Sequence, residues 1–260
     1  MIRQRLGKDL LFFDGGMGTL LQEKGLAPGE LPETWNLTHS EEIYKIHRQY
    51  IEAGSDIILT NTFGANALKF HDDSCSLEEI IKAAVSHVKK AEREALLQTG
   101  DERKIYTALD VGPTGKLLKP MGDLEFETAY EAFKEVVILG EQAGADLIHI
   151  ETMSDTYELK AAVLAAKENT SLPVFATVIF DERKKLLTGA DVSSVVALLE
   201  GLGVDALGIN CAMGPKEMLP VLEELIKYSS VPIIVKPNAG LPKPVSYTHL
   251  RAHETPEHLV

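Results

Sequence analysis

Three polar residues of this sequence each stand seven positions after a glycine, at the end of a short apolar run: Asn61 after Gly54, Glu151 after Gly144 and Asn210 after Gly203. Glycine suits the left-handed position that ends a helix, and each apolar run is typical of a strand buried on both faces. Cys211 follows Asn210 directly. We therefore expect three strand ends to present two amides, a carboxylate and a thiol to one place.

Each of these side chains has an ordinary structural role as its alternative. A free cysteine such as Cys211 is commonly a small buried apolar side chain. A carboxylate that closes an apolar strand, as Glu151 does, is rarely buried unless it is paired, so the alternative to a ligand contact is a salt bridge to a neighbouring loop. The amides of Asn61, Asn210 and Asn238 could equally satisfy the backbone of turns.

A repeating order of strands and helices positions these residues. Seven apolar runs predict strands: residues 10–13, 56–60, 104–109, a run ending at Glu151, 173–180, a run ending at Cys211, and 231–235. Amphipathic patterns predict helices at residues 40–53, 77–98, 126–143, 156–168, 192–202 and 216–228. Residues 26–38, which carry the only tryptophan, are expected to form a proline-rich surface loop.

This order predicts an α/β fold, a (β/α)8 TIM barrel that is incomplete because its eighth strand is missing. A doubly wound open sheet is the alternative. Such a sheet gathers its ligand at one switch point, whereas polar clusters follow at least five of the seven predicted strands. In a barrel the active site lies at the carboxyl ends of the strands, and that position favours a functional role for Cys211 over a core role.

The segment Asp14-Gly15-Gly16-Met17 lies between a predicted strand and a helix. Two consecutive glycines let the backbone approach a ligand closely, and free N–H groups at a helix start favour an anion such as a carboxylate. The alternative is a tight turn with Asp14 as a helix cap. Lys236, at another strand end, could form a Schiff base as in barrel aldolases. His149 alternates with apolar residues and is expected in the core.

The composition limits the classes of partner. The 260-residue chain has a formal net charge of −13 and 45% hydrophobic residues, as in an ordinary globular protein. Nucleic acid and anionic membranes bind positive surfaces, so neither is expected, and a small molecule is favoured. The two cysteines, Cys75 and Cys211, give no disulfide framework, and no apolar run approaches the length of a membrane span. We expect a cytoplasmic protein.

The last fifteen residues differ in composition from the rest. Residues 246–260 contain three of the eight histidines and show no helical or strand periodicity. A histidine-rich tract can bind metal, but nothing in this pattern orients the side chains. We expect residues 1–245 to form one barrel domain that is truncated at its C-terminal end, and residues 246–260 to be a foreign or artefactual tail.

Six segments occur between residue 10 and about residue 244: Asp14-Gly15-Gly16-Met17-Gly18-Thr19, Thr60-Asn61-Thr62-Phe63-Gly64-Ala65-Asn66, Asp110-Val111-Gly112-Pro113, Ile150-Glu151-Thr152-Met153, Gly208-Ile209-Asn210-Cys211 and Lys236-Pro237-Asn238-Ala239-Gly240. Each segment alone is a weak signal. Together and in this order, they resemble the homocysteine S-methyltransferase family, most closely the N-terminal homocysteine-binding modules of cobalamin-dependent methionine synthases.

The resemblance implies a (β/α)8 barrel that holds one zinc ion through three cysteine thiolates, while the zinc holds homocysteine by its sulfur. Zinc deprotonates a coordinated thiol and activates it to accept a methyl group, giving methionine. On this mapping Cys211 is the first zinc ligand, Asn238 lies beside the metal, and Glu151 receives the substrate's ammonium group. Other substrate contacts fall on the remaining mapped residues: Asp14, Gly15, Gly16, Met17, Asn61 and Asn210.

The resemblance also implies the methyl donor and the missing metal ligands. Family members use methylcobalamin, a folate-charged system, a betaine or a sulfonium compound, and for the parent of this chain methylcobalamin is implied, with folate and cobalamin modules as partners. The family's second and third zinc ligands come from a Gly-Gly-Cys-Cys segment at the end of the eighth strand, which this sequence lacks. Cys75 is away from any predicted strand end. We therefore expect this chain to be inactive. The alternatives are a Schiff-base lyase using Lys236 and a non-catalytic fragment.

Overall fold

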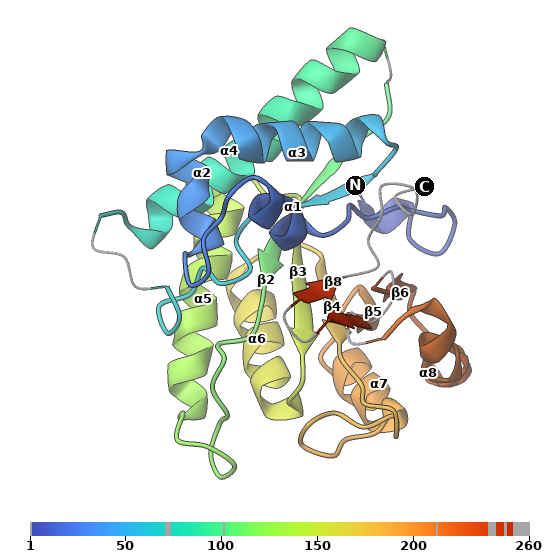
Figure 1. Ribbon diagram of the computed structural model, residues 1–260. Helices are drawn as coiled ribbons and strands as arrows, with labels where there is room; N and C mark the ends of the chain where they lie inside the picture. Colours follow the sequence, from blue (N-terminus) through green and yellow to red (C-terminus); the bar gives the residue numbers. More distant parts are fainter. Residues whose placement is uncertain are drawn as a thin grey trace.

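Six parallel strands form a sheet that curls around the centre of the molecule (Figure 1). The computed structural model describes residues 2–70, 74–100, 102–211 and 213–238, together with the backbone of residues 243–246 and 249–251. The strands are β1 (Ile57–Leu59), β2 (Tyr106–Val111), β3 (Leu147–Met153), β4 (Val174–Val178), β5 (Ala206–Asn210) and β6 (Ile233–Lys236). Their spatial order is their chain order, and every neighbouring pair is parallel.

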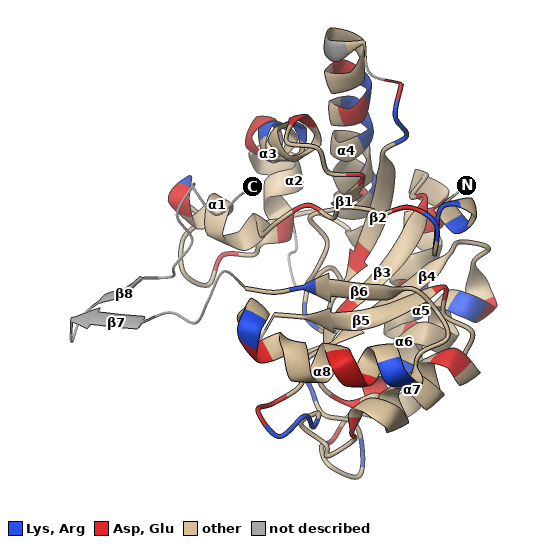
Figure 2. Cartoon of the chain, turned by 90° about the vertical axis from the view of Figure 1, so that its right-hand side faces the viewer, with Lys and Arg blue, Asp and Glu red and all other residues tan. Residues whose placement is uncertain are grey.

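Helices cover the outer face of this sheet, and charged residues of both signs are spread along them (Figure 2). The long helices are α3 (Ser40–Glu52), α4 (Leu77–Thr99), α5 (Phe126–Ala143), α6 (Thr156–Asn169), α7 (Val192–Gly201) and α8 (Pro215–Tyr228). Shorter helices near the N-terminus are the 3-10 helices η1 (Ile2–Gln4) and η2 (Pro32–Thr34) and the α-helices α1 (Met17–Glu23) and α2 (Trp35–Thr38). The largest apolar core packs α4–α8 against the strands. This is the α/β architecture of a half-barrel.

Local sequence signals explain where the helices begin and end. Ser76 and Glu79 form a reciprocal capping box at the start of α4, because each side chain bonds the other's backbone N–H. The three glycines of the repeated motif, Gly54, Gly144 and Gly203, all have positive φ, as the end of a helix before a buried strand requires. The six long helices each begin and end within one residue of the predicted bounds.

The predicted first strand, residues 10–13, is wrong in part. Phe13 forms only an isolated bridge to Ile57, and the N–H groups of Asp56 and Ile57 donate to the carbonyl of Phe12. Leu10 and Phe12 are 77% and 56% exposed, so the run is not buried on both faces. Within the described residues, pairing extends from Phe13 to β6 without closing into a ring, and a segment paired on one side gains only half of a strand's hydrogen bonds.

The expected surface loop at residues 26–38 is wrong in part, because residues 27–30 and 37–38 are exposed while the segment around Trp35 packs into the molecule. Trp35 is only 2% exposed and packs with α3 in an apolar cluster. Its indole N–H donates to Glu30 at 2.7 Å. Proline-rich composition indicated an irregular connection, but burial of one large aromatic side chain decides how the connection lies.

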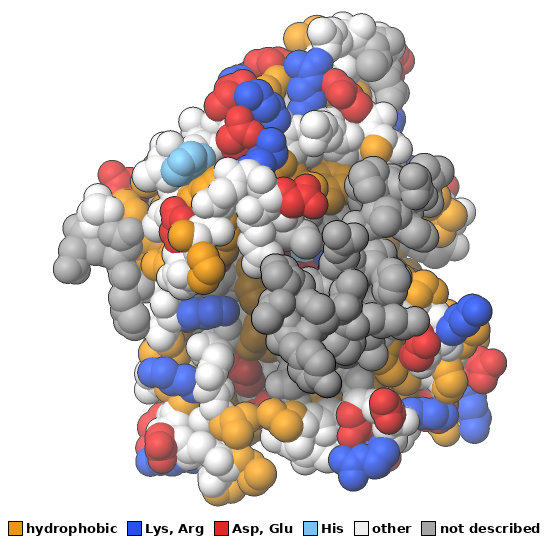
Figure 3. Space-filling model, in the orientation of Figure 1, with side chains coloured by type: hydrophobic (Ala, Val, Ile, Leu, Met, Phe, Trp, Pro, Cys, Tyr) orange, Lys and Arg blue, Asp and Glu red, His pale blue; other side chains and the backbone are white. Residues whose placement is uncertain are grey.

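Two further short strands, β7 (Lys243–Ser246) and β8 (His249–Arg251), pair with each other in antiparallel fashion. Residues 247–248 and 252–260 of the expected tail lie outside the described residues. Among the helices that the structure describes, none has the length and apolar character needed to cross a membrane. On the face drawn in Figure 3, charged side chains of both signs are intermingled over the outer helices rather than gathered by sign.

His47 on α3 is a buried, uncharged histidine. Its side chain is inaccessible to solvent, and neither ring nitrogen has a hydrogen-bond partner within the described chain. Burial lowers the pKa of His47 to about 3, with a further contribution from His87. Below the ordinary histidine pKa, the unfolded chain therefore binds a proton that the folded chain excludes, so stability is lost as pH falls from about 6.5 towards 3.

We expect His47→Leu to make the fold less sensitive to acid. The variant removes the unpaired ring, so its free energy of unfolding should rise relative to wild type by about 2 kcal/mol between pH 7 and pH 5. Urea unfolding at both pH values measures this difference, with the exposed His39→Gln as a control. Equal pH dependence in His47→Leu and wild type would contradict the prediction.

Candidate functional site

The carboxyl ends of the strands line one large cavity. Its volume is about 860 Å³, and it runs beside residues 10–16 and β6, where the two edges of the sheet face each other. All nine residues predicted for the site line this cavity: Asp14, Gly15, Gly16, Met17, Asn61, Glu151, Asn210, Cys211 and Asn238. Convergence of parallel strand ends therefore brings them together, while their individual roles stay predictions.

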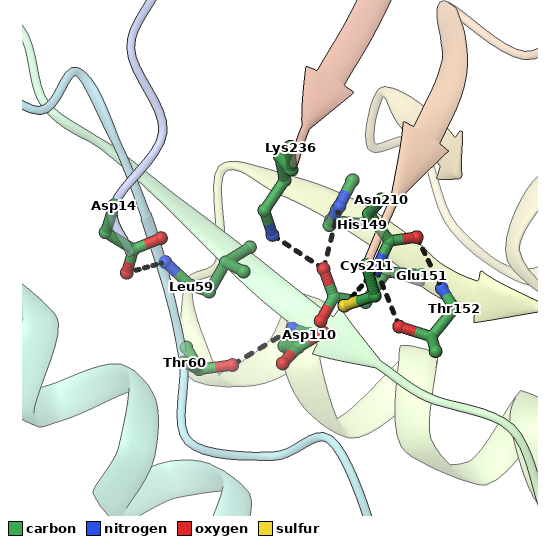
Figure 4. Close-up of polar contacts among 10 residues, drawn as sticks. All are labelled: Asp14, Leu59, Thr60, Asp110, His149, Glu151, Thr152, Asn210, Cys211 and Lys236. Carbon is green, nitrogen blue, oxygen red and sulfur yellow. Dashed lines mark hydrogen bonds and ion pairs between the residues drawn. The ribbon is translucent and has the colours of Figure 1, made fainter. Parts of the chain in front are cut away.

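A largely buried ion pair lines this cavity, between the ends of β3 and β6 (Figure 4). Lys236 at the end of β6 donates from Nζ to Glu151 Oε2 at 2.6 Å, and the two side chains are 18% and 11% exposed. His149 Nε2 lies 3.3 Å from the same oxygen, and the Phe13 ring centre lies 5.2 Å from Nζ. His149 is buried, as predicted. Glu151 thus forms a salt bridge, its predicted alternative, but with another strand end rather than a loop.

The electrostatics of this pair follow from burial and charge. Burial alone would raise the pKa of Glu151, but the charge of Lys236 and the contact with His149 outweigh it and hold this pKa below its usual range. Burial lowers the pKa of Lys236, but the negative charges of Glu151, Asp14 and Asp110 outweigh this effect. The pKa is therefore raised above its usual value, and the lysine stays charged. A Schiff-base lysine needs a lowered pKa, so this environment disfavours that chemistry.

Two more carboxyl groups face the same ion pair. Asp14 accepts from the N–H of Leu59 at 2.9 Å through Oδ2, while its buried Oδ1 has no partner in the described chain. Burial raises the pKa of Asp14 to about 7. Asp110 at the end of β2 also has an unpartnered buried Oδ1, and burial, followed by the charge of Glu151, raises its pKa well above the usual range. Both side chains are more than nine-tenths buried.

Asn210 joins the ends of β3 and β5. Its Oδ1 accepts from the N–H of Thr152 at 3.0 Å, and its Nδ2 donates to Thr152 Oγ1 at 2.7 Å and to Cys211 Sγ at 3.3 Å. Thr152 and Cys211 have φ of 62° and 54°, which is uncommon for residues other than glycine. Burial raises the pKa of the Cys211 thiol, and the charge of Glu151 raises it further.

Asn61 lines the cavity, and its side chain is held by hydrogen bonds to the segment 26–38, which was expected to lie on the surface. Its Nδ2 donates to the carbonyl of Pro32 at 2.7 Å and to Asn36 Oδ1 at 3.3 Å, and Asn36 in turn donates to the carbonyl of Asn61 at 2.8 Å. Glu33 is buried beside them and accepts from the N–H of Gly64 at 2.5 Å. These bonds serve the predicted alternative role of satisfying turn backbone.

The Asp14-Gly15-Gly16 turn comes close to Tyr50. A Cβ at Gly15 would lie 2.7 Å from the Tyr50 hydroxyl, which donates to the carbonyl of Gly16 at 3.2 Å. Only glycine fits at position 15 without displacing this tyrosine. Gly16 precedes the first residue of α1, Met17. Asn238 lines the same cavity, and its N–H donates to the carbonyl of Met213 at 3.2 Å.

The donor set for a metal is small. Cys211 offers a half-buried thiol and Asn238 an amide at the cavity, but no group of three or more His, Cys, Asp or Glu side chains within the described residues could hold a metal ion. Cys75 lines a separate, smaller cavity with Ala67, Phe70, Leu77 and Glu135. A catalytic zinc site uses three protein ligands. The described side chains therefore do not make up such a site.

The sequence analysis named Asp110 within a family segment but gave it no role at the site, and it missed the role of Lys236 as the partner of Glu151. Asp110 ends an apolar strand, which is the signal that identified Glu151, so a place at the site could have been assigned to it. The partnership of Lys236 with Glu151 joins residues 85 positions apart and has no local sequence signal. The buried Glu33 and Asn36 had no signal beyond their proline-rich surroundings.

Comparisons with known proteins agree with this fold. The profile of the family described as homocysteine S-methyltransferase matches residues 11–260. The methionine synthase of Mycobacterium leprae (strain TN) is 34% identical over 250 residues, which cover 92% of this chain and 21% of that protein. The methionine synthase of Mycobacterium tuberculosis (strain ATCC 25618 / H37Rv) is 34% identical over 248 residues, which cover 91% of this chain and 21% of that protein. The chain thus spans about a fifth of the length of these curated relatives.

Solved structures give the same picture. The homocysteine methyltransferase MmuM from Escherichia coli, in its metallated form, superposes with a TM-score of 0.81 at 25% identity, covering 90% of this chain and 85% of that chain. The apo form of the same protein gives a TM-score of 0.76 at 26% identity, covering 90% and 84%. The half-barrel of six described strands therefore corresponds to most of a homocysteine methyltransferase fold.

We expect Asp14→Asn to stabilise the protein progressively as pH rises. The wild-type carboxyl retains its proton up to about pH 7, whereas the unfolded carboxyl loses it near pH 4, so wild-type stability is lost across that window. The variant should gain about 3 kcal/mol in free energy of unfolding relative to wild type between pH 4 and pH 8. Urea unfolding curves at these pH values test this, with the exposed Asp123→Asn as the control. A pH-independent difference would refute a raised pKa.

Proposed function

Because this chain belongs to the homocysteine S-methyltransferase family, we propose that its cavity binds homocysteine and presents the substrate's sulfur for methyl transfer. The observation that carries the proposal is the meeting of a buried carboxylate–ammonium pair and a thiol in one cavity at the carboxyl ends of β3, β5 and β6. Barrel enzymes carry their catalytic groups at these ends. The cavity is also within the size range of small-molecule sites.

The reaction is a displacement at carbon. The sulfur of homocysteine forms a bond to the methyl carbon, the bond between that carbon and the donor breaks, and the thiol proton leaves, so that methionine and the demethylated donor result. The sulfur attacks as the thiolate, which is the nucleophilic form. The resemblance to cobalamin-dependent methionine synthases supports methylcobalamin as the donor in the longer parent protein, with folate and cobalamin modules beyond residues 1–245.

This chain's residues would hold the amino-acid part of the substrate. The Glu151 carboxylate is ionised and already binds an ammonium group, that of Lys236, so it suits the ammonium of homocysteine. Asp14 Oδ1 is a further buried oxygen at this cavity with no partner in the described chain. The Gly15-Gly16 backbone and Met17 form the adjoining wall, and Asn61 and Asn210 border the remaining sides of the cavity.

The family resemblance implies zinc, but the described residues do not fit a complete zinc centre. Cys211 would supply one thiolate, and Asn238 lies at the same cavity as a further oxygen donor. The sequence holds one other cysteine, Cys75, which lines a different cavity. Burial and the nearby carboxylate raise the pKa of Cys211, so a lone cation would have to displace its proton.

We expect Glu151→Gln to weaken homocysteine binding at least tenfold, because the substrate's ammonium would lose its ionised partner. Isothermal titration calorimetry with homocysteine measures this. The matched control is Glu224→Gln, which removes the carboxylate of an equally short ion pair with Lys184 away from the cavity. Homocysteine that fails to bind the wild-type chain would refute the proposed function, and equal binding to Glu151→Gln would refute the assigned role.

We expect the 260-residue chain to hold zinc weakly and to transfer no methyl group from methylcobalamin to homocysteine. One thiolate with an amide gives too few ligands for tight binding. Competition with a chromophoric chelator measures zinc affinity. Cys211→Ala should reduce the residual affinity, whereas Cys75→Ala should leave it unchanged. One zinc ion per chain that only strong chelators remove would contradict this expectation.

A further inference from the structure

His47 on α3 is a buried polar side chain that the fold leaves without a partner. Its ring is inaccessible to solvent, and neither nitrogen has a hydrogen-bond partner among the described residues. Buried polar atoms are nearly always hydrogen-bonded, so this exception calls for an explanation. His149 is buried too, but a carboxylate oxygen of Glu151 lies 3.3 Å from its Nε2 and favours a charged ring. Because His47 has no such contact, a proton on its ring would destabilise the packing around it.

The helix α4, which packs against α3, brings three titratable groups to this junction. Glu94 accepts from the Tyr44 hydroxyl at 2.5 Å, and Lys90 Nζ lies 4.2 Å from the centre of the Tyr44 ring. Both groups are therefore engaged with Tyr44 on α3. The third group, His87, is the one whose charge further lowers the pKa of His47.

The other elements around the ring add no free carboxylate within the described residues. Neither α2 nor β1 contains a charged residue, and Glu33 on η2 accepts from the N–H of Gly64 at 2.5 Å. On α3 itself the neighbouring cations are paired along the helix: Lys45 with Glu42, and Arg48 with Glu52. A protonated His47 would thus meet no compensating charge in the closed structure.

The short helix α2 joins this junction to the wall of the main cavity. It lies beside α3 and α4 (Figure 1). His87 Nε2 donates to the carbonyl of Asn36 at 2.7 Å, and the side chain of Asn36 donates to the carbonyl of Asn61 at 2.8 Å. Asn61 lines the cavity. Trp35, which precedes Asn36, packs in an apolar cluster with two isoleucines of α3.

We propose that α2 is an acid-sensitive latch on the cavity wall: protonation of His47 releases Trp35 and Asn36 from α3 and α4, and the contact with Asn61 is lost while the sheet stays folded. The helix has four residues and no side-chain cap at its N-terminus. Side-chain contacts rather than strand pairing hold it, and such segments open at a lower free energy than the whole fold.

The direction of the pH effect follows from proton binding. In the closed form, burial lowers the pKa of His47 to about 3, with a further contribution from His87. Separation of α2 admits water to the ring, which then has the ordinary histidine pKa of about 6.5. The open form therefore binds the proton more tightly, and acid favours opening. The equilibrium constant for opening should rise about thirtyfold between pH 7.5 and pH 5.

Hydrogen exchange followed by mass spectrometry measures this opening on the full chain. Protection factors, corrected for the pH dependence of intrinsic exchange, report the opening constant of each segment. We expect residues 34–39 to be less protected than α6, because α2 opens locally, and their protection to fall about thirtyfold between pH 7.5 and pH 5. Residues 60–66 should follow, since the N–H of Gly64 donates to Glu33, next to α2.

Variants identify the histidine that senses acid. In His47→Leu the fall in protection should shrink to about twofold or less, and His47→Met carries the same expectation if His47→Leu fails to fold. His39→Gln tests the exposed histidine whose ring stacks on Trp35 at 4.0 Å. His87→Gln keeps a side-chain donor for the carbonyl of Asn36. Both of these variants should retain most of the fall.

Several results would overturn the latch. Equal protection of α2 and α6 would mean that α2 opens only with the whole fold. An undiminished fall in His47→Leu, or a fall lost in His39→Gln instead, would remove His47 as the sensor. Unchanged protection of residues 60–66 would disconnect α2 from the cavity wall. Homocysteine takes no part in these measurements, so the latch and the proposed function are tested independently.

Discussion

The ion pair between Lys236 and Glu151 depends on the curl of the sheet. β4 and β5 lie between β3 and β6 in the sheet order. With strands about 4.8 Å apart, third neighbours in a flat sheet would lie about 14 Å apart, with side chains standing parallel to each other. Lys236 Nζ nevertheless lies 2.6 Å from Glu151 Oε2. The two side chains meet because the sheet wraps, so that the strand ends incline towards one centre. That wrapping also creates the cavity.

Convergence of strand ends concentrates acid groups around a single cation. Asp14, Asp110 and Glu151 all interact with Lys236, which cannot neutralise three charges in a poorly solvated place. The structure resolves this conflict by keeping Glu151 ionised beside the lysine, while burial raises the pKa values of Asp14 and Asp110. Each of the two aspartates keeps one buried oxygen without a partner in the described chain, and that oxygen is available to a polar group of a ligand.

Much of the fold followed from local patterns, because amphipathic periods and glycine positions act within one element. The helix bounds and the common cavity of the nine site residues were predictable on that basis. Contacts between distant segments were not. Residues 10–13 fail as a strand since they pair on one side only, and part of the segment 26–38 is buried around Trp35. The ion pair between Lys236 and Glu151 depends on the curvature of the sheet, which no local sequence pattern encodes.

The thiol and the ion pair are set by the same three strands. Asn210 uses both ends of its amide on Thr152 and Cys211, which holds two left-handed backbones that would each cost about 1–3 kcal/mol if unsupported. Gly208 lets β6 approach β5, because a Cβ there would lie 1.9 Å from the carbonyl oxygen of Ile234. The backbone that carries Lys236 is therefore fixed relative to the backbone that carries Cys211. A ligand that reaches both features therefore meets a pair of opposite charges at one end and a thiol at the other.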